Sequence, residues 1–62
     1  MTPKSLQVAR IEAVRFLDLA NEVRIAPLLN GDLYVVNDPK LTGALRRASM
    51  DLTRALAEMR RP

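Results

Sequence analysis

Apolar residues recur along residues 39–60 at alternating steps of four and three. The repeating positions are Leu41, Leu45, Ala48, Leu52, Ala55 and Met59, flanked by Ala44 and Leu56. This is the heptad spacing of an α-helix that packs lengthwise against another helix. Alternation of leucine with alanine lets large side chains enter gaps opposite small ones, so that the two helices approach closely. The pattern predicts an amphipathic helix over about residues 39–60.

Residues 3–24 also have a helical pattern, but their apolar positions cover a wider arc. One broad face carries Leu6, Ala9, Ala13, Phe16, Leu17, Ala20 and Val23, with Val8 and Leu19 extending one edge. Ile11, Val14 and Ile25 fall among the polar residues on the far side. One neighbouring helix covers a stripe of about 100°, so the wider arc favours a second neighbour. The alternative is that the outer aliphatic side chains are simply exposed, as many are on ordinary protein surfaces.

The two predicted helices share the same entry signal. Thr2-Pro3 and Asp38-Pro39 each place a side-chain acceptor at the expected N-cap and a proline at the first helical position. The cap oxygen satisfies a free backbone N–H, and the missing proline N–H has no helical partner to lose there. Because the two helices have matching lengths, we expect them to form an antiparallel pair.

The connection, about residues 26–37, is longer than most helix–helix loops and carries β-structure signals. Asn30-Gly31 is the favoured pair for a type I′ turn, in which both residues have positive φ. Residues 33–36 are β-branched or aromatic for the most part, and Pro27 confines the preceding segment to an edge or to a short strand. We expect a short β-hairpin or strand that is apolar on both faces and therefore buried or at an interface. The alternative is an irregular loop whose aliphatic side chains cap the helices.

The size of the chain bears on how this fold could be stable. Its 62 residues allow one domain, and so small a domain buries only about 60% of the surface that its unfolded chain exposes. There is no cysteine and no histidine, so disulfides and the commonest metal ligands are excluded. Oligomerisation is then the remaining way to enlarge the core. The sequence predicts a mainly α fold with the order α-β-β-α over residues 1–62.

We expect this hairpin to form a homodimer as a four-helix bundle, with a tetramer as the alternative. The candidate interface comprises the outer face of the first helix and the connecting strand. Its residues are Ile11, Val14, Phe16, Ile25, Leu33, Tyr34, Val35 and Val36.

The sequence offers no candidate catalytic residue, cofactor site or metal site. A Ser–His or Cys–His pair cannot be built, and the two glycines lack the spacing of a phosphate-binding loop. Each of the seven carboxylates has a simpler expected role as a helix cap, a turn residue or part of a charged helix face. We therefore expect a non-enzymatic interaction module, such as a scaffold, adaptor or small regulator, whose partners are itself and an unidentified protein.

A net charge of +3 makes nucleic acid the alternative partner. On the second helix, charges of opposite sign alternate at steps of four and three along Arg47, Asp51, Arg54, Glu58 and Arg61. Side chains at these steps are expected to pair with one another, which would neutralise that face. The candidate contacts to nucleic acid that remain are Arg46, Arg60 and Arg61. In this alternative the chain is a small basic dimer that binds nucleic acid or regulates transcription.

The sequence gives no sign of a membrane role. No apolar run approaches the roughly 18 residues that span a bilayer, and the N-terminal segment lacks the uninterrupted apolar core of a signal peptide. Membrane-surface helices carry basic residues with few acidic ones, whereas the two signs alternate here. Together with the lack of cysteine, this favours a cytoplasmic location.

Overall fold

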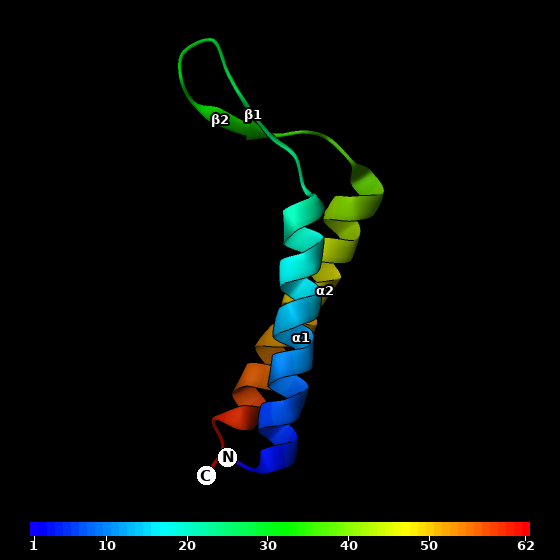
Figure 1. Cartoon of the computed structure of the whole chain (residues 1–62), viewed down its shortest axis with the longest axis vertical. Coiled ribbons are helices and arrows are strands. Elements are labelled where there is room, and N and C mark those ends of the chain that lie inside the picture. The colour runs from blue at the N-terminus through cyan, green and yellow to red at the C-terminus, as the bar shows by residue number, and fades with distance from the viewer.

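The computed structural model describes residues 1–62 and consists of two helices joined by a two-stranded hairpin (Figure 1). The elements are α1 (Pro3–Glu22), β1 (Ile25–Pro27), β2 (Leu33–Val35) and α2 (Pro39–Met59). The helices run antiparallel, so both chain ends lie together and the hairpin projects from the opposite end (Figure 1). The predicted α-β-β-α order is confirmed.

Both predicted helix caps are present. The Thr2 hydroxyl accepts the Ser5 N–H at 3.0 Å, and Ser5 Oγ accepts the Thr2 N–H at 3.0 Å in return. At the second helix, Asp38 Oδ1 accepts the Leu41 N–H at 3.2 Å. These bonds satisfy backbone donors that have no partner within the helix. The caps fix where each helix begins, and the helices that follow, of 20 and 21 residues, are similar enough in length to lie side by side.

The contact between the helices is close and small. Only three residues are buried, and all are alanines: Ala9, Ala48 and Ala55. The larger heptad residues of α2 are half-buried beside them, namely Leu41, Leu45, Leu52, Leu56 and Met59. The heptad positions predicted for α2 therefore do face α1, although Ala44 beside them is exposed.

The first helix turns a narrower stripe towards α2 than its sequence pattern predicted. Its half-buried apolar residues are Leu6, Phe16, Leu19, Ala20 and Val23. Ala13 and Leu17 belong to the broad apolar face identified in the sequence, but both are exposed. The physical reason is that α1 packs on α2 alone, and one helix cannot cover the whole apolar arc.

The turn of the hairpin differs from the predicted type I′ turn. Gly31 has a φ of +91° and is the only residue with positive φ, so Asn30 does not adopt the conformation that type I′ requires. The Gly31 N–H donates to the Leu28 carbonyl at 3.1 Å, and the Leu28 N–H donates to the Asp32 carbonyl at 2.6 Å. These bonds define a turn over residues 28–31 that ends in a left-handed glycine, a three-residue hairpin loop. The prediction was wrong because Asn30 and Gly31 occupy the last two turn positions, not the central two.

The hairpin stands apart from the helices. Strands β1 and β2 pair only with each other, in antiparallel register, and neither packs on α1 or α2. The molecule measures 49 × 22 × 14 Å, and its radius of gyration is 14.9 Å. A compact domain of this length would have a radius of gyration of about 11 Å. The chain is thus unusually extended for its length.

Neither helix is both long enough and apolar enough to cross a membrane.

Candidate interaction surface

A stripe of aliphatic side chains crosses the outer surface of α1. Its members follow one another at steps of three: Val8, Ile11, Val14 and Leu17. Ile11 is 57% exposed and Val14 59% exposed, so nothing in the chain covers the middle of this α1 stripe. Rows with a step of three wind obliquely around a helix and form a ridge that fits a groove on another helix. The α1 stripe has the form of a helix-packing surface without its partner.

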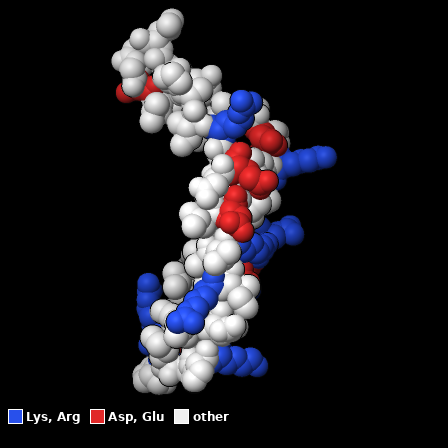
Figure 2. All heavy atoms as spheres, in the orientation of Figure 1, with Lys and Arg blue, Asp and Glu red and all other residues white.

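The hairpin presents a second apolar surface. In its register Ile25 faces Val35 and Pro27 faces Leu33, so these four side chains lie on one face of the ribbon. We call this the hairpin face; all four residues are exposed, Leu33 by 70%. Asp32 is the only charged residue in positions 25–36. The hairpin accordingly appears almost entirely white in Figure 2, whereas charged side chains mark the length of the helix pair.

Most of the candidate interface residues are indeed exposed. Six of them are open to solvent on the two surfaces or beside them: Ile11, Val14, Ile25, Leu33, Tyr34 and Val35. Phe16 and Val36 are half-buried, and Phe16 lies on the side of α1 that carries the buried Ala9. The structure therefore brings the candidate residues into two separate surfaces, one on α1 and one on the hairpin.

Sequence reasoning left six exposed large apolar residues out of the candidate interface: Met1, Val8, Leu17, Leu28, Leu29 and Met50. The sequence analysis had placed Leu17 on the broad apolar face of the first helix and Val8 at its edge. The step of three that links both to Ile11 and Val14 was the available signal. Nothing in the sequence pattern marked Leu29, which lies at the tip of the turn.

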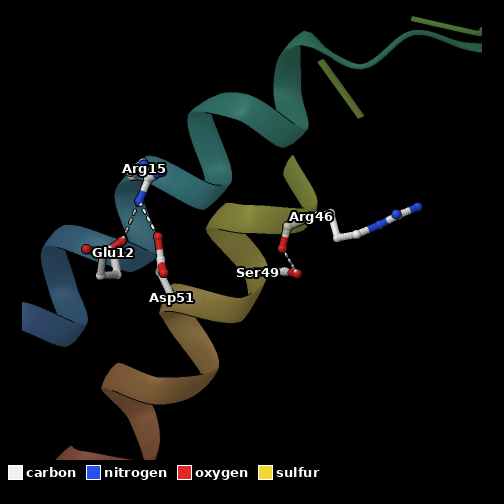
Figure 3. A network of polar contacts seen from close by, with 5 residues as sticks. All are labelled: Glu12, Arg15, Arg46, Ser49 and Asp51. Atoms are coloured by element: carbon white, nitrogen blue, oxygen red, sulfur yellow. Dashed lines mark hydrogen bonds and ion pairs between the residues drawn. The ribbon is translucent and has the colours of Figure 1, made fainter. Parts of the chain in front are cut away.

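The charges on α2 do not neutralise one another as predicted. Asp51 pairs instead with Arg15 of α1, with 2.9 Å between Oδ2 and Nη1 (Figure 3). Only Glu58 and Arg61 of the expected ladder form an ion pair, at 3.5 Å. Four arginines of α2 and its C-terminal end consequently have no acidic partner within 4.0 Å: Arg46, Arg47, Arg54 and Arg60.

The remaining candidate contacts to nucleic acid lie on the outside of the helix pair. Arg46 extends away from both helices, while its carbonyl accepts the Ser49 hydroxyl at 2.6 Å (Figure 3). Arg60 caps the end of α2, and Arg61 carries the ion pair with Glu58. These three side chains do not converge into one site within a single chain, since Arg46 and Arg60 are separated by almost four helical turns.

Two further features concern possible metal ligands and buried polar groups. No three acidic side chains gather closely enough to hold a metal ion, and no buried polar side-chain atom lacks a hydrogen bond. The two apolar surfaces and the unpaired arginines are the most prominent surface features of the chain. No protein-family model, characterised protein or solved structure matches the chain.

Proposed function

We propose that this chain is a non-enzymatic interaction module that works as a self-associated assembly. The supporting observation is its surface area. The chain exposes 5246 Å², whereas a compact monomer of 6.9 kDa exposes about 4,000 Å². The excess is therefore about 1,200 Å² per chain. Two chains that buried this excess would remove about 2,400 Å² from water, more than the roughly 1,600 Å² of a standard stable interface.

The character of the exposed surface supports the same proposal. The buried core consists of three alanines, while the α1 stripe and the hairpin face expose larger aliphatic side chains. Burial of apolar surface contributes about 25 cal/mol per Å², so most of the available hydrophobic stabilisation lies outside the monomer core. A homodimer with four helices is the simplest closed assembly that would use it. Such a dimer would act as a scaffold, adaptor or small regulator of a larger protein.

Light scattering after size exclusion, over a hundredfold range of concentration, tests the proposal. We expect a mass of twice 6.9 kDa that persists on dilution. Ile11→Lys and Val14→Lys should each shift the assembly towards monomer while leaving the helical circular dichroism largely intact. Gln7→Lys is a matched control, because Gln7 is an exposed polar residue of the same helix. A folded monomer at every concentration would contradict self-association.

Nucleic-acid binding is the second candidate, and the unpaired arginines of α2 favour it. Arg46, Arg47, Arg54 and Arg60 keep their charge available for phosphate, which guanidinium groups bind through two parallel hydrogen bonds. A symmetric dimer would present two such sets. Fluorescence anisotropy with a labelled DNA duplex should then show affinity that falls steeply with salt, and that falls again with Arg46→Glu and Arg60→Glu. Affinity that responds to neither change would eliminate this candidate.

A further inference from the structure

We infer that the outer edge of β2 is the site at which two copies of this chain pair, forming a four-stranded antiparallel sheet centred on Tyr34. The inference rests on the proposed self-association and specifies which backbone groups carry it. It follows from the direction of the hydrogen-bonding groups, from Pro27, and from the symmetry of the strand.

The hydrogen bonds of the hairpin show which backbone groups point outwards. The Val36 N–H donates to the Arg24 carbonyl at 2.8 Å, and the Leu28 N–H donates to the Asp32 carbonyl at 2.6 Å. Hydrogen-bonded pairs alternate with non-bonded pairs in an antiparallel ladder, so Ala26 and Tyr34 form the bonded pair between them. The residues at the non-bonded positions therefore turn their N–H and C=O groups to the two outer edges: Ile25 and Pro27 on β1, and Leu33 and Val35 on β2.

The two edges are not equivalent. Pro27 has no N–H, so the β1 edge lacks one of its two donors and cannot accept a complete neighbouring strand. Strand β2 offers both donors and both acceptors, from Leu33 and Val35. Natural edge strands are commonly protected by proline, by charged side chains or by a covering element. Strand β2 contains no proline or charge, and no helix packs against it.

The β2 edge is complementary to itself. Leu33 and Val35, whose backbone N–H and C=O groups point to this edge, lie symmetrically on either side of Tyr34. A two-fold axis at Tyr34 would place Leu33 of each copy opposite Val35 of the other, as two hydrogen-bonded pairs that share four backbone bonds. This symmetry is why we assign the edge to a second copy of the chain.

The same arrangement would also bring the apolar side chains of the two hairpins together. Pairing at β2 joins the two hairpin faces into one continuous apolar face with eight residues, four from each copy. A lone two-stranded hairpin is marginally stable in water, whereas a sheet of more strands with an apolar face is stable. Asp32, the only charge in the hairpin, lies beyond the paired strand, so the two copies bring no like charges together at the axis.

Proline substitution at the two edges provides the first test. Val35→Pro removes a donor from the β2 edge, and Ile25→Pro removes a donor from the β1 edge of the same hairpin. Neither N–H is used within the hairpin, so the two variants are matched. We expect Val35→Pro to raise the dimer dissociation constant at least tenfold, because each copy loses one intermolecular hydrogen bond. Ile25→Pro should change it by less than about twofold. An equal response to both substitutions, or no response to Val35→Pro, overturns the inference.

A cysteine placed at the expected axis provides the second test. The chain has no cysteine of its own, so Tyr34→Cys introduces a single thiol. Directly opposed residues in a non-hydrogen-bonded pair have Cα atoms about 4.5 Å apart, within the range of a disulfide. Mild oxidation should convert Tyr34→Cys to a covalent dimer at low concentration, and Leu29→Cys at the exposed turn should remain largely monomeric. If the native protein is a dimer but Tyr34→Cys does not cross-link, the edge is wrongly assigned while self-association stands. If the native protein is a monomer, both proposals fail.

Discussion

Arg15 on α1 and Asp51 on α2 form the only ion pair between the two helices, with 2.9 Å between Nη1 and Oδ2 (Figure 3). The same nitrogen lies 3.1 Å from Glu12 Oε2. Hydrogen bonding to Asp51, and then to Glu12, raises the pKa of the Arg15 guanidinium above its ordinary value. The pair joins one position of α1 to one position of α2, beside the packed alanines and half-buried leucines, and we expect it to contribute to the alignment of the helices along their length.

Asp51→Asn should therefore lower the thermal midpoint of unfolding slightly, since both partners are partly exposed and the pair is screened by solvent. The loss should shrink as salt is raised, because screening already weakens the pair. Glu58→Gln is the control, as its ion pair with Arg61 lies at the end of α2 and joins no two helices. Thermal circular dichroism at low and high salt measures both variants, and an equal loss would contradict the alignment role.

The sign of the Arg15 shift also gives an expectation for pH. A raised pKa means that folding favours the charged form, so its stabilising effect is fully present below the ordinary pKa of arginine. It is lost only as the pH rises through the raised value, far into the alkaline range. Replacing Arg15 by Gln should consequently leave the slope of stability against pH unchanged around neutrality. A change in that slope on Arg15→Gln, measured by denaturation at several pH values, would contradict this account.

Gly31→Val should disrupt the hairpin and leave the helices intact. A β-branched residue at a φ of +91° is strained by about 1–3 kcal/mol, although no neighbouring atom obstructs the new side chain. Asn30→Ala should have a smaller effect, because it removes two exposed side-chain bonds without straining the backbone: the Asp32 N–H donates to Asn30 Oδ1, and Asn30 Nδ2 donates to Asp32 Oδ2. Faster amide exchange at Leu28 and Val36, with unchanged exchange in α2, would be the signature. Equal effects of the two variants would argue against the described turn.

Ala48→Leu should destabilise the helix pair by about 1–3 kcal/mol, because Ala48 is completely buried and a larger side chain would force the helices apart. Ala57→Leu is the matched control on the exposed side of the same helix, where the change should be close to neutral. Urea unfolding followed by circular dichroism measures both. A tolerated Ala48→Leu would mean that the helices are less closely packed than described.

Thr2→Ala and Asp38→Ala should each reduce the free energy of unfolding by about 1 kcal/mol, since each removes a helix cap. Ser5→Ala tests the reciprocal bond to the Thr2 N–H and should have an effect in the same direction. Thr53→Ala serves as a control on an exposed helical hydroxyl that does not cap a helix start. Thermal unfolding of the four variants side by side would reveal whether the caps matter.

Much of this fold could be predicted from the sequence because periodicity and capping are local. The heptad positions from Leu41 to Met59 face α1, and the caps at Thr2 and Asp38 form as expected. Periodicity does not show which part of a wide apolar arc contacts the neighbouring helix, and so it did not reveal that Leu17 lies outside that contact. Asp51 was expected to pair within α2 because spacing along one helix reveals nothing about a partner from another helix.

The turn type could not be predicted from the sequence for a different reason. An Asn-Gly pair suits more than one hairpin loop, and the choice depends on where the strands stop pairing. Here the ladder continues to the bond between Leu28 and Asp32, so Asn30 and Gly31 complete a longer loop. The exposed surfaces were anticipated in outline from Ile11, Val14 and the strand residues. How far they project from the helix pair could not be anticipated, because the sequence does not show that the hairpin makes no contact with the helices.

The placement of Pro27 opposite Leu33 determines how many neighbours a pairing hairpin can have. A hairpin with two unprotected edges can pair with a neighbour on each side, and such pairing can continue without limit, as in a fibril. Because Pro27 removes a hydrogen-bond donor from the β1 edge, only the β2 edge of each copy can accept a complete neighbouring strand. In the proposed dimer, strand pairing would therefore stop at two chains, and this single proline would prevent the growth of an unlimited polymer.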